Sequence, residues 1–245
     1  MGGEHFDKVA TVYARGRPPY PERVWTLLTE HGVLRPGALL LEIGAGSGQA
    51  TAALVAGGAR VDAVEPGPRL AADLRRRLPN VQVAEGRIED QDLPGSRYDA
   101  AVAATSLHWV DLAVVLPRVH HALRPGGLLA AWWTVFGDPA VRTPFRDAVQ
   151  RIANPTGAPE TRRTALDTDA WEADLTAGGW FAPVVTEVVR WRVTLTTEQV
   201  RDLFTTFPTW TPAQVDAIAA AAERLGGRVE EHYATAVYVL RRLDL

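Results

Sequence analysis

Short apolar runs alternate with amphipathic segments from residue 38 to residue 135. Runs typical of buried strands lie at 38–43, 60–66, 81–86, 98–105 and 128–135. Helical patterns lie between them at 51–56, 69–78 and 110–123, and the LRPGG segment at 123–127 is expected to end the last helix and lead into the fifth strand. Strands that alternate with helices in this way predict βαβ units and a mostly parallel sheet.

The pattern changes after Gly137. Helical segments are predicted at 142–153, 168–177, 196–207 and 211–225, and strands at 184–195 and 229–243. Two late strands can pair antiparallel at the edge of a parallel sheet. The helices between them are therefore predicted to form an insertion.

Composition and charge exclude several classes of protein. The 245 residues are 47% hydrophobic and 22% charged, as in a soluble globular domain, and a net charge of −3 argues against a nucleic-acid partner. The chain has no Cys, which excludes disulfides, thiolate metal sites and cysteine nucleophiles. The start lacks the apolar core of a signal peptide, and the longest apolar run, 128–136, is too short to span a bilayer. We therefore expect a cytoplasmic protein without a membrane partner.

A Gly-rich turn follows the first predicted strand in the segment EIGAGSG, residues 42–48. A strand that leads into such a turn and then a helix is typical of a nucleotide-cofactor site, because glycines let the backbone approach the ligand closely. Glu65 ends the second strand about 20 residues later, where an acidic side chain can bind both hydroxyls of a ribose. The turn and Glu65 together predict either a dinucleotide or S-adenosylmethionine (SAM).

Two residues favour SAM over a dinucleotide. The dinucleotide pattern G-x-G-x-x-G requires glycine at position 49, where this chain has Gln49. Glu42, two residues before the turn, does not suit an anionic pyrophosphate, whereas SAM carries an ammonium and a sulfonium and no phosphate. Because a buried carboxylate is costly unless something pairs with it, Glu42 is predicted to hold the ammonium of SAM, directly or through water.

Four segments resemble motifs of the class I SAM-dependent methyltransferases. EIGAGSG is similar to their E/D-x-G-x-G-x-G motif, VEPGPRL to the second-strand motif, AEGRIEDQDLP to the third-strand motif and LRPGGLL to the turn before strand five. The resemblance implies a Rossmann-like α/β fold: a mostly parallel seven-stranded sheet with an antiparallel edge strand, helices on both faces and a helical insertion between the last two strands. It implies one domain over 1–245, with N-terminal cap helices at 1–36, a cofactor-binding core at 37–137, and substrate-side helices, insertion and edge strands at 138–245.

Two further segments resemble a branch of this superfamily that includes trans-aconitate methyltransferase-like enzymes acting on small molecules. YARGRPPYP is similar to a Y-x-x-x-R-P-x-Y-P segment, and TSLHWVD to an A-x-H-W-F-D loop. By this resemblance Arg17 pairs with the carboxylate of SAM and Tyr13 covers the cofactor. Arg87 replaces the first acid of the third-strand motif, so we expect the adenine contact at Glu89, with the backbone of Ile88. The expected cofactor-binding residues, with no metal among the cofactors, are Tyr13, Arg17, Glu42, Gly44, Ala45, Gly46, Gly48, Glu65, Pro66, Ile88, Glu89, Thr105 and Trp109.

Methyl transfer from SAM, which leaves S-adenosylhomocysteine (SAH), is an in-line displacement that needs alignment more than a base. His108 follows the fourth strand at the carboxyl edge of the sheet and is the candidate general base; contact with the cofactor or ordering of its loop are alternatives. Trp132 and Trp133 end the fifth strand at the same edge. With Trp210 of the insertion they are the candidate substrate contacts.

The sequence therefore predicts a SAM-dependent methyltransferase that acts on a small-molecule acceptor, at a carboxylate or hydroxyl oxygen. Two alternatives stay open. One is a SAM-binding protein that does not methylate, such as a cyclase, an isomerase or a regulatory partner. The other is an NAD-dependent oxidoreductase, which Gln49 and Glu42 disfavour. The chain is expected to act as a monomer or a weak homodimer.

Overall fold

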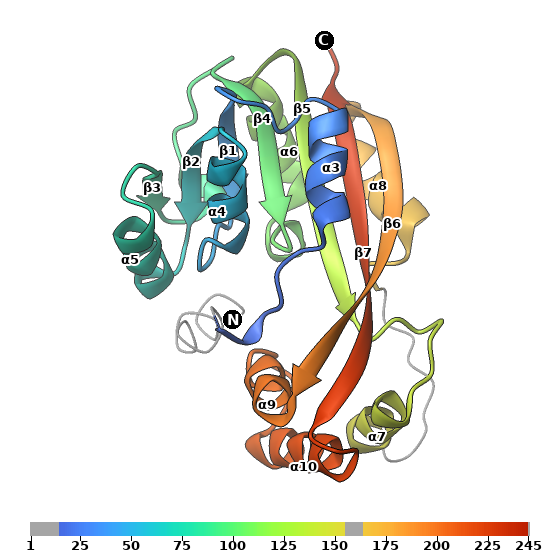
Figure 1. Cartoon of the computed structure of the whole chain (residues 1–245). Coiled ribbons are helices and arrows are strands. Elements are labelled where there is room, and N and C mark those ends of the chain that lie inside the picture. The colour runs from blue at the N-terminus through green and yellow to red at the C-terminus, as the bar shows by residue number, and fades with distance from the viewer. Residues whose placement is uncertain (1–14, 155–163, 245) are drawn as a thin grey trace. The chain divides into compact units, whose positions relative to one another are not determined.

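The computed structural model of the chain describes residues 15–154 and 164–244. Within these residues seven strands form one sheet in the order β3-β2-β1-β4-β5-β7-β6 (Figure 1). The strands are β1 Leu39–Ile43, β2 Arg60–Glu65, β3 Gln82–Glu85, β4 Tyr98–Ala104, β5 Leu123–Phe136, β6 Phe181–Thr196 and β7 Arg228–Arg242. β1 to β5 pair in parallel, and β7 runs opposite to its neighbours β5 and β6. The predicted mixed sheet is confirmed.

Helices connect most of these strands. They are α3 Glu22–Glu30, α4 Gln49–Ala56, α5 Pro68–Arg77, α6 Leu112–Ala122, α7 Pro144–Ala153, α8 Thr168–Thr176, α9 Thr197–Thr205 and α10 Pro212–Arg224. Two short 3₁₀ helices, η1 Ile88–Asp90 and η2 Leu107–Trp109, follow β3 and β4. Because α9 and α10 lie between β6 and β7 in the chain, the predicted helical insertion is confirmed.

The chain divides into two compact units. The core unit comprises the described parts of Tyr20–Thr134, Ala165–Val189 and Thr235–Leu245. The helical unit comprises the described parts of Met1–Pro19, Val135–Thr164 and Arg190–Ala234. Each of β5, β6 and β7 contributes residues to both units. The predicted division at residues 36 and 137 stays a prediction.

The central strands β1 and β4 of the core unit are buried on both faces of the sheet. Leu41 and Ile43 of β1 point into an apolar cluster that includes Val115 of α6. Because side chains alternate along a strand, Glu42 points to the opposite face. Figure 1 shows α3 and α4 on the side of the sheet away from α6. The carboxyl group of Glu42 therefore lies beneath the helix that follows the Gly-rich turn.

The LRPGG segment lies inside β5 and does not precede it. Leu123 pairs with Tyr98, and Leu128 pairs with Ala100, so the residues between Leu123 and Leu128 form a bulge in the strand. Pro125 cannot donate a ladder hydrogen bond, and such a residue is tolerated at a bulge. The predicted end of the helix was correct, whereas the strand begins five residues earlier than expected.

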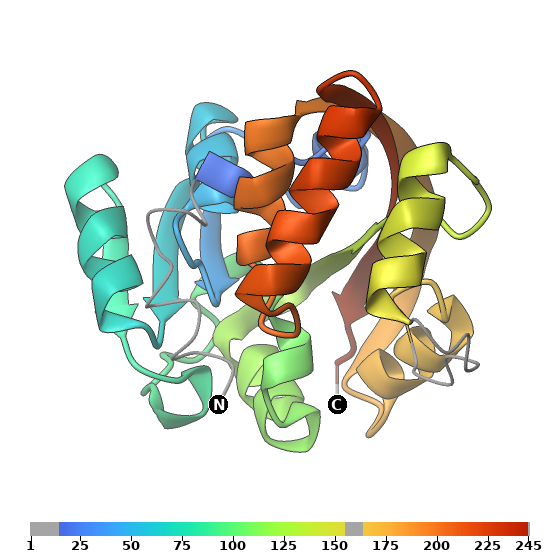
Figure 2. The same ribbon diagram turned by 90° about the horizontal axis from the view of Figure 1, so that it is seen from below.

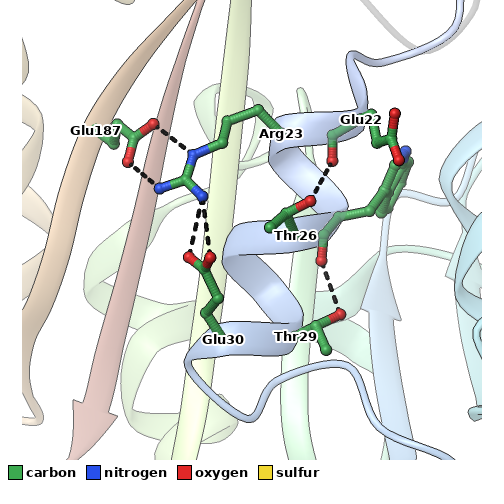
Figure 3. Close-up of polar contacts among 7 residues, drawn as sticks. Glu22, Arg23, Thr26, Thr29, Glu30 and Glu187 are labelled. Carbon is green, nitrogen blue, oxygen red and sulfur yellow. Dashed lines mark hydrogen bonds and ion pairs between the residues drawn. The ribbon is translucent and has the colours of Figure 1, made fainter.

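An ion-pair network fastens α3 to β6 within the core unit. Arg23 donates to the two carboxylate oxygens of Glu187 at 2.9 and 2.8 Å, and one of its amino groups also contacts Glu30 (Figure 3). The hydrogen bond from Arg23 lowers the pKa of Glu187. Both ends of this contact are partly exposed. We therefore regard the network as fixing the orientation of α3, while its buried face supplies the packing energy.

The helices of the helical unit begin at clear sequence signals. Thr196 and Thr211 each accept a hydrogen bond from the backbone of a glutamine three residues later, and that glutamine side chain accepts one in return. Such capping boxes satisfy two backbone donors at a helix start. α10 packs against both α9 and α7 (Figure 2), and it buries Ile218 completely.

Two neighbouring valines of α6 test the packing of the core unit. Val115 is 0% exposed and Val114 is 42% exposed. Val115→Ala should lower the free energy of unfolding by about 1.5–3 kcal/mol, because it removes buried methyl groups. Val114→Ala should change it by less than about 0.5 kcal/mol, since the side chain is already in water. Urea unfolding of both variants measures the difference, and equal losses would contradict the packing of α6.

Candidate functional site

The Gly-rich turn connects β1 to α4 at the carboxyl edge of the parallel strands. Gly44 has a φ of +69°, and a Cβ there would lie 2.6 Å from the Cβ of Ser106. The Ser106 hydroxyl donates to the carbonyl of Ile43, so the loop after β4 is fastened to the end of β1. Gly46 has a φ of +57°, and a Cβ added to it would meet no heavy atom within 4 Å. The turn is thus closed on the side of Gly44 and open at Gly46.

The other turn residues hold the backbone in place. Gly44 and Ala45 donate to the carbonyl of Val64 at the end of β2, at 2.8 and 3.2 Å. Gly48 lies at the N-terminus of α4 with a φ of +81°, and its α-carbon faces Leu74 so closely that a side chain would collide. These contacts fix the path of the turn before any ligand is bound.

Glu42 is a buried carboxyl group directly beneath the turn. Its side chain is 0% exposed. Burial raises the pKa of Glu42 to about 8; hydrogen bonding with Thr51 of α4 lowers the pKa in part, and the nearby charge of Glu65 raises it further. Neither carboxyl oxygen has a hydrogen bond of good geometry within the described residues. Such a group is suited to a cationic ligand that approaches through the turn.

Glu65 ends β2 with its carboxylate held by two backbone donors. Gly46 N–H donates to Oε2 at 2.7 Å, and Gly67 N–H donates to Oε1 at 2.8 Å. These bonds orient the carboxylate, and each carboxylate oxygen can accept more than one hydrogen bond. Pro66, which follows directly, is exposed. The geometry suits the ribose contact that was predicted for Glu65.

Glu89 in η1 pairs with the residue that breaks the expected motif. Arg87 donates to Glu89 Oε1 at 2.6 Å, while Glu89 Oε2 is buried without a hydrogen-bond partner among the described residues. Burial alone would raise the pKa of Glu89, but hydrogen bonds from Arg87 and the backbone outweigh it and lower the pKa. Ile88 beside it is buried. An ionised carboxylate with one open oxygen can accept a hydrogen bond from an amino group such as that of adenine.

Thr105 closes β4 in a conformation that is unusual for a residue with a side chain. Its φ is +59°, its N–H donates to the carbonyl of Trp132, and its hydroxyl lies 3.2 Å from the hydroxyl of Tyr20. Strained residues often mark functional sites. Tyr20 is not among the site residues expected from the sequence, although it belongs to the RPPYP segment that carries part of the resemblance.

His108 and Trp133 form a hydrogen-bonded pair beside this loop. Trp133 Nε1–H donates to His108 Nδ1 at 2.9 Å. Trp109 is 50% exposed, and its ring lies 4.6 Å from that of His108. Desolvation by the surrounding protein lowers the pKa of His108 to about 4, although solvent still reaches part of the side chain. The imidazole is therefore neutral at pH 7.

Trp132 and Trp133 point to opposite faces of the sheet, as the alternation of β5 predicts. Trp132 is 0% exposed, and its ring meets those of Tyr20 and Trp25 edge-on at 5.5 and 5.8 Å. Trp133 packs in the cluster with α6. In the described structure Trp132 packs behind Thr105. Its predicted contact with the substrate stays a prediction.

The helical unit holds two further predicted residues. The guanidinium of Arg17 lies 4.6 Å from the ring centre of Phe136 and 4.2 Å from that of Phe207. Trp210 packs edge-on against Phe204 at 5.4 Å. Tyr13 lies outside the described residues. The roles of these three residues at the cofactor or substrate stay predictions.

The helical unit contains a buried polar cluster that is not among the residues expected from the sequence. Arg146 of α7 lies 2.7 Å from Glu231 of β7, and Glu231 and Tyr233 are both 0% exposed. Burial raises the pKa of Glu231 to about 7, against the opposing effect of Arg146. No sequence signal links residues 146 and 231, because only the pairing of distant elements brings them together.

Metal clusters and membrane-spanning helices are both absent from the described parts of the chain. Residues 15–154 and 164–244 contain no group of three or more His, Asp or Glu side chains that could hold a metal ion. The same residues contain no helix long and apolar enough to cross a membrane.

Comparisons with known sequences point to one family. Residues 41–131 match the family described as a methyltransferase domain. An uncharacterized methyltransferase of Mycobacterium tuberculosis (strain ATCC 25618 / H37Rv) is 38% identical over 128 residues, which are 52% of this chain and 51% of the relative. The chain thus spans about half the length of the mycobacterial relatives that it matches. An uncharacterized methyltransferase-like protein of Schizosaccharomyces pombe is 25% identical over 80% of this chain and 74% of its own length.

Solved structures share the fold over nearly the whole chain. A protein of Anaeromyxobacter dehalogenans described as a type II methyltransferase matches with a TM-score of 0.68 and 24% identity, over 94% of this chain and 99% of that one. The geranyl diphosphate C-methyltransferase of Streptomyces coelicolor A3(2), solved with SAH, matches with a TM-score of 0.51 and 16% identity, over 94% of this chain and 88% of that one. The matched segment includes the Gly-rich turn, so residues 41–131 are similar to a methyltransferase domain, and these solved methyltransferases share the fold of the chain.

Proposed function

We propose that this chain binds SAM at the carboxyl edge of the core unit and transfers its methyl group to an oxygen of a small-molecule acceptor. The observation that carries the proposal is the buried carboxyl group of Glu42 beneath the open side of the Gly-rich turn. A carboxyl group in this place destabilises the free chain, and an ammonium group from the ligand would compensate for it.

The residues of the core unit fit the parts of the cofactor. Glu42 faces the ammonium, the backbone at Gly46 leaves room for close approach, and Glu65 offers two oriented oxygens to the ribose. Glu89 Oε2 offers an open acceptor to the adenine amino group. When bound, SAM would supply a methyl group on a sulfonium. An incoming nucleophile would bond to that methyl group in line, with the sulfur as the leaving group. The fit of donor and acceptor types along this edge supports SAM over an anionic dinucleotide.

The chain's own part in the reaction is alignment. The turn is fastened to β2 and to the loop after β4, so the atoms that hold the ligand are positioned before it binds. Alignment of two reactants contributes roughly 7–11 kcal/mol to such reactions. A carboxylate or hydroxyl oxygen is the acceptor atom that we propose. A carboxylate would need no proton removal, whereas a hydroxyl would need a base.

A ligand titration followed by a turnover assay tests the proposed function. SAH and SAM should each raise the Tm of the chain, by roughly 5–10 °C at about 100 times their dissociation constants, and NADH should not. Incubation with SAM and a panel of small carboxylic acids and alcohols should then release SAH. Binding of SAM without SAH release from any acceptor would favour a SAM-binding protein that does not methylate. A rise in Tm with NADH alone would overturn the cofactor assignment.

Glu42→Gln should raise stability and abolish cofactor binding. The pKa of Glu42 is about 8 in the folded chain and near 4.5 when unfolded, so the folded state keeps a proton that the unfolded state loses between these values. Glu42 therefore costs stability progressively as pH rises from about 4.5 to 8, on the order of 5 kcal/mol in total. The Tm of Glu42→Gln should exceed that of the parent by more at pH 8 than at pH 5. SAH should no longer raise the Tm of Glu42→Gln.

The exposed Glu22 provides the matched control for this substitution. Glu22→Gln should leave both the pH dependence of Tm and the response to SAH unchanged. Differential scanning fluorimetry at the two pH values, with and without SAH, measures all three chains. If the Tm of Glu42→Gln and the Tm of the parent fell in parallel as pH rises, Glu42 would not be the buried acid responsible for the pH dependence.

A pair of glycine substitutions separates backbone strain from loss of ligand space. Gly46 and Gly37 have φ values of +57° and +79°, and neither has a heavy atom within 4 Å of an added Cβ. Gly46→Ala and Gly37→Ala should each cost about 1–2 kcal/mol, because both residues adopt the left-handed conformation. Only Gly46→Ala should weaken SAH binding, by about tenfold or more, since its methyl group would fill the space that the ligand needs. Isothermal titration with SAH measures this, and equal affinities would contradict the site.

A further inference from the structure

Trp133 determines which nitrogen of His108 carries the proton. An indole N–H can only donate a hydrogen bond, and it points at His108 Nδ1 at 2.9 Å. Nδ1 must therefore be the acceptor, and the proton of the neutral imidazole must lie on Nε2. The opposite tautomer would place two N–H groups against each other.

The indole that imposes this tautomer is itself held firmly within the core unit. Trp133 is 3% exposed, and its ring stacks on Trp171 of α8 at 4.3 Å with an interplanar angle of 26°. Tyr238 of β7 meets the ring edge-on at 5.5 Å. With both contacts in place, the indole cannot turn its N–H away from His108 without breaking the packing of three aromatic rings. The hydrogen bond is therefore a built-in constraint on the imidazole.

A histidine held in this way cannot serve as a general base through Nε2. The lone pair of Nδ1 is engaged by Trp133, and Nε2 already carries a proton, so neither nitrogen can take a proton from an acceptor molecule. Nε2–H can instead donate a hydrogen bond. Solvent reaches part of the His108 side chain, so a ligand can reach it as well.

The carboxylates around this edge have other contacts. Glu65 accepts from the amides of Gly46 and Gly67, Glu89 pairs with Arg87, and Asp111 caps the first turn of α6. Desolvation is the cause of the shift in the pKa of His108, and no charged side chain of the described residues contributes to it. His108 therefore offers a hydrogen-bond donor at this edge, and the described residues place no acid against the imidazole to relay a proton.

We propose that His108, held by Trp133 as its Nε2–H tautomer, donates a hydrogen bond to an oxygen of the methyl acceptor, and that the acceptor is a carboxylate. This inference rests on the proposed methyl transfer. A lone pair of one carboxylate oxygen forms the new O–CH₃ bond, and the electron pair of the S–CH₃ bond stays on sulfur. The products are an ester and SAH, and no proton moves. His108 orients the acceptor through its other oxygen, and Trp133 is a positioning residue that acts through His108.

The tautomer can be measured without any acceptor. Long-range ¹H–¹⁵N correlation spectra of the full chain, labelled with ¹⁵N-histidine and loaded with SAH, resolve the tautomer of each of the six histidines. The signal absent from His108→Gln assigns His108. The parent should show the Nε2–H tautomer, and Trp133→Phe should show a mixture because the indole donor is lost. A predominant Nδ1–H tautomer in the parent would overturn the proposal.

Activity with matched probes tests the chemical role. SAH release should be higher with benzoate, phenylacetate and short aliphatic carboxylates than with the alcohols of the same skeletons. With the most active carboxylate, His108→Gln should keep its rate within about tenfold of the parent, because its amide N–H can replace Nε2–H. His108→Ala should lose roughly 10- to 100-fold. Loss of a general base would instead lower the rate of both variants by about 10²–10⁴-fold and remove a limb of the pH profile.

The outcomes distinguish a failure of this inference from a failure of the proposed methyl transfer. An SAH-induced rise in Tm in both His108 variants shows that they are folded and bind the cofactor. SAH release only with alcohols would overturn the carboxylate assignment. Failure of every acceptor to give SAH would contradict the proposed function, while the tautomer measured by NMR would still decide whether Trp133 controls His108.

Discussion

A carboxyl group buried in the middle of a parallel sheet is the constraint around which the site is arranged. β1 pairs with β2 on one side and β4 on the other, so Glu42 has no route to solvent along the sheet. An apolar side chain at this position would stabilise the free chain, as the flanking Leu41 and Ile43 do. On the function that we propose, the cost of Glu42 is recovered when the ammonium of SAM occupies the turn. At position 42 an apolar residue would favour stability, whereas the proposed ligand binding requires the carboxyl group.

The elements that build this site could be predicted from the sequence because their signals are local. The apolar runs, the Gly-rich turn and the helix-capping residues each act within a few residues of one another, and the structure confirms the sheet and the insertion. The error at LRPGG has the same origin. Pro125 and the following glycines signal an interruption, but they do not say whether the chain leaves the strand or bulges within it. That depends on the neighbouring β4, whose register resumes at Ala100.

Several contacts of the structure could not be predicted, because they depend on the local path of a turn or join residues from separate elements. Arg87 was noted as a departure from the expected motif, but its ion pair with Glu89 depends on how the chain turns in η1. Tyr20 reaches Thr105 across 85 residues. Arg146 and Glu231, which form an ion pair, are likewise 85 residues apart in the chain. A period of two or 3.6 residues carries no information about such pairs, whereas it predicts well which face of an element is buried.

His108 shows why the type of a residue does not decide its role. Its position after β4 makes it the natural candidate for a base, and an isolated imidazole would suit that task. The proton position on His108 is set by Trp133 of the neighbouring strand β5. The Trp133 indole points to the opposite face from Trp132 because side chains alternate along β5. A shift of one residue in the register of β5 would exchange the two tryptophans and free both nitrogens of His108. The pairing of β4 with β5 therefore determines the proton position on His108 as well as the fold, and on our proposal it also determines which acceptors the edge can hold.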